Sequence, residues 1–205
     1  QSSVNALGAV YVSANAVAQR VTHIIIVPFQ AYMNVSSTFT GQNMGAGEFD
    51  RIKKGVLWGI AILTGFWAAE LVLTYLVGSR VLLLFLKAEE IALVEEPAMM
   101  FIKIYAWGQF FLTFVQVVRL AIQGMSFSKL ALVAGMLEMI PRILLAIFVV
   151  PRYGYIGACL ASPSAWLMAT IFLIPAFEVC FRKRKAEYEQ KKLLHEAAAY
   201  KAADT

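Results

Sequence analysis

Charged side chains within apolar stretches of this sequence are the first candidates for chemistry, because a charge in hydrocarbon needs a partner or a function. Glu138 and Arg142 lie four residues apart with the acid first, which is the favourable order for an ion pair along a helix. Mutual neutralisation is the simpler interpretation of this pair, and a proton-sensitive switch is the sharper one. Arg119 lies within about a turn of the end of its apolar stretch, so its side chain is long enough to reach water.

Glu70 is the acid in these stretches that has no obvious partner on its own helix. Trp67 and Thr74 flank it on the same face. An unpaired carboxyl group in such surroundings could exchange a proton, whereas partial hydration near the end of the stretch is the ordinary alternative. Glu70, Glu138 and Arg142 are therefore our candidates for ion coupling.

Amide and hydroxyl side chains recur at helical spacing in two apolar stretches. At 100° per residue, one stripe consists of His23, Gln30, Asn34 and Ser37, and the other of Tyr105, Gln109, Thr113, Gln116 and Gln123. In lipid, a polar stripe must face protein or a water-filled cavity. Hydrogen bonding to a neighbouring helix explains the first stripe equally well, whereas the longer second stripe suits a helix that lines an aqueous path. The predicted substrate cavity contains Gln30, Asn34, Ser37, Tyr105, Gln109, Thr113 and Gln116.

The sequence carries no motif of an enzyme or a metal centre. The glycine-rich run GQNMGAG at 41–47 lacks the Gly-Lys-Ser/Thr ending of a phosphate-binding loop. HExxH, GxSxG and CxxC motifs are absent, and Cys159 and Cys180 fit buried packing positions better than metal ligands. The net charge of +5 collects at helix ends and in the tail, without a basic run interleaved with aromatic residues. We expect no catalytic residue, no metal and no nucleic-acid partner.

The composition predicts an all-α integral membrane protein. Of the 205 residues, 60% are hydrophobic and 15% are charged, and the mean hydropathy is +0.68. Soluble domains are about 45–50% apolar and about 25% charged. The apolar runs predict about five transmembrane helices, at 16–39, 56–77, 98–122, 130–150 and 155–181. Residues 1–15 would form the end of a preceding helix and an external turn, residues 16–181 the bundle, and residues 182–205 a basic surface helix that frays.

Glycine and proline residues predict the breaks in this bundle. Gly41, Gly45 and Gly47 would stop the first span and reverse the chain. Residues 79–97 indicate an interfacial segment, with Pro97 in the first turn of the third span. Kinks are expected near four other prolines, which are Pro28, Pro141, Pro163 and Pro175.

The distribution of Lys and Arg predicts the orientation in the membrane. One end of the bundle holds the clusters at 51–54 and 182–185 together with Lys129, and the other end holds Arg80, Lys87 and Arg152. The glycine hairpin and the C-terminus should therefore lie in the cytoplasm, with the chain in the plasma membrane. Five spans place the first residue outside, and because that residue is Gln1 rather than Met, we expect a fragment that lacks an N-terminal part.

The stretch from Ala14 to Gly55 resembles the multidrug and toxic compound extrusion (MATE) transporters, through its proline-containing span, its GQN-GAG run and the basic cluster that follows. Tyr105–Gly124, Arg142 and the YGYIGACLA run at 153–161 are similar to later helices of that family. The resemblance implies the C-terminal lobe of a twelve-helix, two-lobe transporter, with the N-terminal lobe, the lipid bilayer and a small organic substrate as partners. It also implies export of organic, often cationic, compounds in exchange for H⁺ or Na⁺ by alternating access, with no cofactor beyond the coupling ion.

One departure from the family pattern concerns the tenth helix, where some members carry an aspartate shortly before a glutamine. This chain has Thr113 before Gln116 at that place, which puts a coupling acid on this helix in doubt. Two other functions stay open. A flippase for lipid or polysaccharide precursors would need several basic residues to hold phosphates, and here only Arg119 and Arg142 qualify. A non-transporting membrane scaffold would bury its polar stripes against neighbouring helices.

Overall fold

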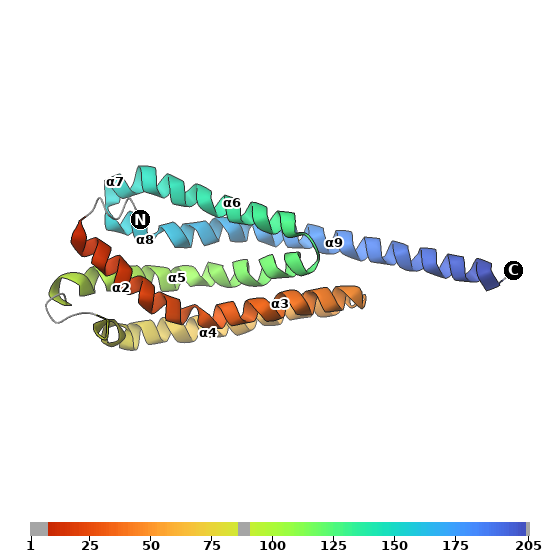
Figure 1. The fold of residues 1–205 in the computed structure, drawn as a ribbon, viewed down its shortest axis with the longest axis horizontal. Coiled ribbons are helices and arrows are strands. Elements are labelled where there is room, and N and C mark those ends of the chain that lie inside the picture. The colour runs from red at the N-terminus through yellow and green to blue at the C-terminus, as the bar shows by residue number, and fades with distance from the viewer. Residues whose placement is uncertain (1–7, 86–90, 204–205) are drawn as a thin grey trace.

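The computed structural model describes residues 8–85 and 91–203, with the backbone alone at 33, 34 and 201–203. Within these residues the chain forms helices joined by short turns, without any strand (Figure 1). Four of the described helices are long and apolar enough to cross a membrane, and a bent pair makes a fifth if it counts as one span. The prediction of an all-α membrane bundle of about five spanning helices is confirmed for this part of the chain.

The first span is a bent pair of helices, α2 (Ala9–Ile25) and α3 (Val27–Gly45), which meet at an angle of 45°. Pro28 occupies the first turn of α3. Because proline has no N–H, it donates no hydrogen bond to the carbonyl group four residues earlier, which loosens the helix at that level. The kink predicted near Pro28 is therefore present, and the helical pair is longer than the predicted 16–39 at both ends.

A tight turn joins α3 to α4 (Phe49–Leu83), and Gly47 within it has a φ of 75°, a left-handed conformation that favours glycine. α3 ends at Gly45, one of the three glycines predicted to stop it, and so extends beyond residue 39, where the span was predicted to end. The prediction that Gly41 also stops the helix is wrong. Gly41 lies inside α3, opposite Gly124 at the end of α5 (Ile91–Gly124), where the small size of both residues lets the two backbones approach closely.

α5 (Ile91–Gly124) is the central helix, and it packs against α2, α3, α4 and α9 (Figure 1). The prediction that Pro97 lies in the first turn of this span is wrong, because the helix begins at Ile91 and Pro97 is inside it. Pro97 is half-buried, and its neighbours Val94 and Ala98 are buried in a hydrophobic core cluster, so the helix carries this proline in a turn that packs against the bundle. Residues 86–90, within the predicted interfacial segment, lie outside the described residues, whereas 79–83 belong to α4.

The remaining helices are α6 (Ser128–Leu144), the π-helix η1 (Leu145–Val149), α7 (Val150–Tyr153), α8 (Tyr155–Cys159) and α9 (Ala161–Ala203). A π-helical segment begins four residues after Pro141, and Ser128–Tyr153 together form one candidate span; the kink near Pro141 stays a prediction. Pro163 falls in the first turn of α9, where a helix needs no N–H, so the helix starts at the place where a kink was predicted. Gly154, with φ of 60°, turns the chain between α7 and α8.

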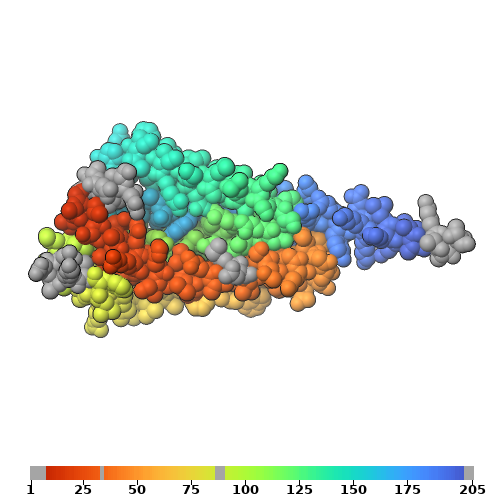
Figure 2. Space-filling view, viewed as in Figure 1, coloured from red at the N-terminus to blue at the C-terminus, as the bar shows by residue number. Residues whose placement is uncertain are grey.

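α9 continues without interruption from the bundle into the basic tail, and Pro175 lies inside it. Its 43 residues correspond to a length of about 64 Å. Figures 1 and 2 show its second half leaving the bundle as a projecting rod. Within the described residues, 182–203 of the predicted tail are therefore the end of the last spanning helix rather than a separate surface helix.

Candidate functional site

Three charged residues meet between α5 and α6. Arg119 of α5 donates from Nη2 to Oε1 of Glu138 on α6, and Nη2 of Arg142, one turn along α6, lies 3.6 Å from the other oxygen of the same carboxylate. Glu138 is only 8% exposed, whereas the side chain of Arg142 is 43% exposed. The spacing of Glu138 and Arg142 indicated their pairing. It could not show that Arg119, expected to reach water, instead joins them from another helix.

Glu70 of α4 has a different environment from Glu138. It is 8% exposed, and both of its carboxyl oxygens are buried without a hydrogen-bond partner among the described residues. The indole N–H of its neighbour Trp67 donates instead to the carbonyl oxygen of Ala106, at 2.8 Å. Glu70 is thus a buried acid to which the described part of the chain offers no counter-ion.

A groove of about 350 Å³ contains Glu70 and lies beside the bend between α2 and α3. Its wall is formed by α2, α3, α4 and α5, and every lining side chain is apolar except Glu70 and Thr74. Pro28 and Phe29, next to the bend, belong to this wall. We call it the Glu70 groove. Any change in the bend would move the wall that faces the carboxyl group.

The predicted polar stripe of α5 is divided by the structure. Gln109 and Thr113 are completely buried, and the hydroxyl group of Thr113 donates to the backbone carbonyl of Gln109. The side-chain amide of Gln109 has no partner among the residues described. Tyr105 and Gln116 are half-buried, and the Tyr105 ring packs edge-on against Trp166 with ring centroids 5.1 Å apart.

The stripe predicted on the first span lies on the surface of this bundle. Gln30 is exposed, as is His23, and Ser37 is half-buried, whereas the side chain of Asn34 lies outside those described. A second set of polar residues on the same span points into the bundle instead: Thr22, Ser36, Thr40 and Asn43 are buried. These residues were not among the predicted site residues, although the spacing of Ser36, Thr40 and Asn43 by four and three residues places them on one helix face.

The two sides of the bundle differ in polarity. Along the middle of α4 the exposed large side chains are apolar, namely Leu57, Trp58, Ile62, Phe66, Val72, Leu73, Tyr75 and Leu76. The exposed side of α3 is mixed, with Gln30, Thr38 and Gln42 beside the exposed Val27 and Val35. Because hydrocarbon cannot hydrogen-bond to amide groups, the α4 side suits contact with lipid, whereas the exposed amides of Gln30 and Gln42 suit contact with water or protein. Within the described residues there is no group of three or more His, Cys, Asp or Glu side chains that could hold a metal ion.

The comparisons with known proteins agree with this membrane bundle. The MatE family model matches residues 1–148, a region that contains α2 to α6 together with Glu70, Arg119, Glu138 and Arg142. No curated protein and no solved structure matches the chain. The family match covers more than half of the sequence, and it begins before the bent span and ends just after α6. The chain therefore belongs to the MatE family of membrane transporters.

Proposed function

We propose that this chain is a lobe of a secondary antiporter that exports organic, often cationic, compounds in exchange for H⁺ or Na⁺. The observation that carries the proposal is the contrast between two buried acids. Glu138 is neutralised by Arg119 and Arg142, whereas Glu70 has no partner among the described residues. A coupling group must be able to gain and lose a cation during the cycle, and of the two acids only Glu70 has an unoccupied carboxyl group.

The environment of Glu70 supports exchange of a small cation. A buried carboxylate without a partner is costly, so the group is tolerated either as the neutral acid or with a cation beside it. The Glu70 groove contributes no other titratable side chain. Binding of a cation to the carboxyl group would then favour one angle between α2 and α3 at the adjacent bend. Alternating access requires a conformational change of this kind.

The substrate path follows the polar residues of α3 and α5 in this proposal. Gln30 of α3 and Gln116 of α5 have accessible surface and can contact a solute. Ser37 and Tyr105, on the same two helices, are half-buried. Asn34, whose side chain lies outside those described, stays a prediction for this path. Gln109 and Thr113 are closed off in this conformation, so their role would require movement of α5 against its neighbours. Glu138 and Arg142 are weaker candidates for ion coupling than Glu70, because a cation could bind Glu138 only by displacing an arginine.

The charge cluster also bears on the flippase alternative. A phosphate-bearing precursor needs unoccupied arginine or lysine donors. Arg119 and Arg142 both direct a guanidinium nitrogen to Glu138, so each is already engaged. This arrangement favours a substrate without phosphate.

The test uses the full-length protein in everted vesicles with an imposed pH or sodium gradient. Addition of a fluorescent organic cation should collapse the gradient, and Glu70→Gln should reduce this exchange to the background rate because an amide cannot exchange a cation. Glu196→Gln, at an exposed tail position, is the matched control and should leave exchange unchanged. Normal exchange by Glu70→Gln would remove Glu70 from the mechanism, and no exchange by the unmodified protein with any organic cation would contradict the proposed function.

A further inference from the structure

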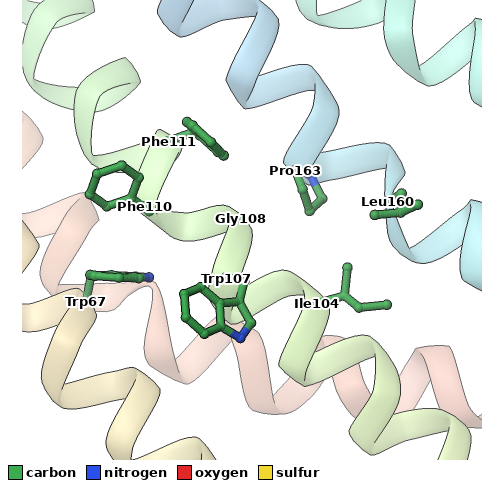
Figure 3. Close-up of a pocket in the computed structure, with 8 residues that line it drawn as sticks. All are labelled: Trp67, Ile104, Trp107, Gly108, Phe110, Phe111, Leu160 and Pro163. Atoms are coloured by element: carbon green, nitrogen blue, oxygen red, sulfur yellow. The ribbon is translucent and has the colours of Figure 1, made fainter.

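A hollow of about 520 Å³ opens between α4, α5 and the junction of α8 with α9 (Figure 3). Figure 3 shows the rings of Trp67, Trp107 and Phe110 on one side of it, and Leu160 and Pro163 on the other. Phe111 completes the ring-lined part. We call this hollow the aromatic groove.

The lining of the aromatic groove presents carbon atoms, and no free indole N–H group, to a bound molecule. The indole N–H of Trp67 donates to the Ala106 carbonyl, and the indole N–H of Trp107 donates to the hydroxyl group of Tyr75 at 3.1 Å. Both tryptophans therefore present ring faces rather than free donors. At the floor, α5 and α9 are so close that a methyl group on Gly108 would lie 3.0 Å from the Cα atom of Pro163. The occupant that suits such a surface is a hydrocarbon chain.

The groove opens on the side of the bundle that suits contact with lipid. Trp107 and Leu160 at its rim are exposed, and so are the apolar side chains along α4 beside it. The groove is thus within reach of the acyl chains of the bilayer.

Charged residues continue the groove along α5 toward the start of that helix. Lys103 lies one turn from Trp107, and its Nζ atom is 5.5 Å from the centroid of the Tyr75 ring. Glu95 and Glu96 lie about two turns further on and share with Lys103 a second hollow, of about 510 Å³. Along the helix, the rise is about 6 Å from Trp107 to Lys103 and about 10 Å from Lys103 to Glu96. The order along α5 is therefore apolar, basic, acidic.

We propose that this strip binds one phospholipid with an ethanolamine headgroup. Its acyl chain occupies the aromatic groove, its phosphate pairs with Lys103, and its ammonium group pairs with Glu96. The order of the three sites is the order of the three parts in the lipid itself. Tyr75 and Trp107 are the residue types that gather at the level of lipid headgroups, which places Lys103 at the depth of a phosphate.

The headgroup chemistry separates this lipid from its common alternatives. A glycerol headgroup carries a phosphate and no cation, so Glu95 and Glu96 would repel it rather than hold it. A choline headgroup carries a quaternary ammonium that has no N–H to donate to a carboxylate. Only the primary ammonium can form a charge-assisted hydrogen bond with Glu96 while the phosphate meets Lys103.

The experiment measures lipid retention by the full-length protein in native mass spectrometry. Equal amounts of phosphatidylethanolamine, phosphatidylcholine and phosphatidylglycerol with identical acyl chains compete for the purified protein. Phosphatidylethanolamine should be retained about ten-fold better than either competitor, the factor expected for one charge-assisted hydrogen bond. Equal retention of the three lipids, or preference for phosphatidylglycerol, would overturn the proposal.

Variants assign each part of the lipid to its residues. Lys103→Gln and Glu96→Gln, both at exposed positions, should each abolish the preference for phosphatidylethanolamine, whereas Lys129→Gln, an exposed lysine on α6, should retain it. Leu160→Trp should fill the aromatic groove and lower retention of all three lipids, in contrast to Leu132→Trp on the exposed face of α6. An unchanged preference in both Lys103→Gln and Glu96→Gln would contradict the headgroup assignment. The exchange assay is a separate readout, so the lipid site can fail while the proposed transport stands.

Discussion

Glu138 holds two arginines at once, and the geometry of the two contacts is unequal. Arg119 reaches it from α5 with its side chain 22% exposed, and Arg142 reaches it along α6 at 3.6 Å with its side chain 43% exposed. In a weakly polar environment the loss of one partner costs more than the pair itself contributes, because the remaining charge stays buried. Arg119 is therefore the partner on which the burial of Glu138 depends.

Arg119→Met is predicted to lower the free energy of unfolding by about 3 kcal/mol, since it leaves Glu138 with a single, more distant partner. Arg119→Met combined with Glu138→Met should recover most of this loss, because the charge that remains, Arg142, has a side chain that is 43% exposed and can be solvated. The measurement is unfolding by SDS in mixed micelles, analysed as a double-mutant cycle. Arg182→Met is the control, since its bridge to Glu178 is solvent-exposed and should contribute less than about 1 kcal/mol. Additive losses in the double variant would show that the two residues do not depend on each other.

At the scale of helices, the backbones of α3 and α5 come close together where α3 passes the end of α5. A Cβ atom on Gly124 would lie 2.7 Å from the carbonyl oxygen of Ser37 and 2.7 Å from the Cβ atom of Thr40. Backbone at this distance cannot move aside without separating the helices. Glycine at 124 therefore sets the spacing of α3 and α5, which carry the two polar stripes.

Gly124→Ala is predicted to destabilise the bundle by about 1–3 kcal/mol, the usual cost of overpacking. Gly135→Ala provides the matched control, because nothing lies within 4 Å of a Cβ atom at that position of α6. There the substitution should stabilise the protein by about 0.5–1 kcal/mol through helix propensity. Thermal unfolding of the two variants in the same detergent gives opposite shifts if the spacing argument holds, and shifts of the same sign if it does not.

The helices themselves could be predicted from the sequence, whereas much of their surroundings could not. Long apolar runs determine a spanning helix whatever its neighbours are, and a proline such as Pro28 acts on its own hydrogen bonds. The ends of the helices were harder to predict from the sequence. Pro97 gave no reason to extend α5 back to Ile91, and the basic tail gave no sign that α9 continues through it. The candidate site was predicted residue by residue, but the contact of Arg119 with Glu138 depends on the packing of α5 on α6, which no spacing within one helix reports.

At the scale of the whole molecule, α9 joins two turns that are far apart in the sequence. Nε of Arg184 donates to the carbonyl oxygen of Met125 at 2.8 Å, and its guanidinium lies 4.6 Å from the Phe127 ring centroid, in the turn between α5 and α6. One turn further on, the Tyr188 ring packs over Gly47 and lies 5.6 Å from the ring of Phe49, at the turn between α3 and α4. The base of the projecting rod thus holds both turns at the same end of the bundle.

Arg184→Ala and Tyr188→Ala are each predicted to loosen a different turn. Hydrogen exchange should become about ten-fold faster at 125–127 in the first variant and at 45–49 in the second, because local opening loses one specific contact. Lys191→Ala, at an exposed position with neither contact, should change neither segment. A chain truncated after residue 190 keeps both contacts. Both turns should therefore stay protected from hydrogen exchange, since the contacts depend on the base of the rod rather than on its length. If that truncation accelerated exchange at both turns, the distal part of α9 would have to stabilise the bundle, and the claim that Arg184 and Tyr188 stabilise the two turns would be wrong.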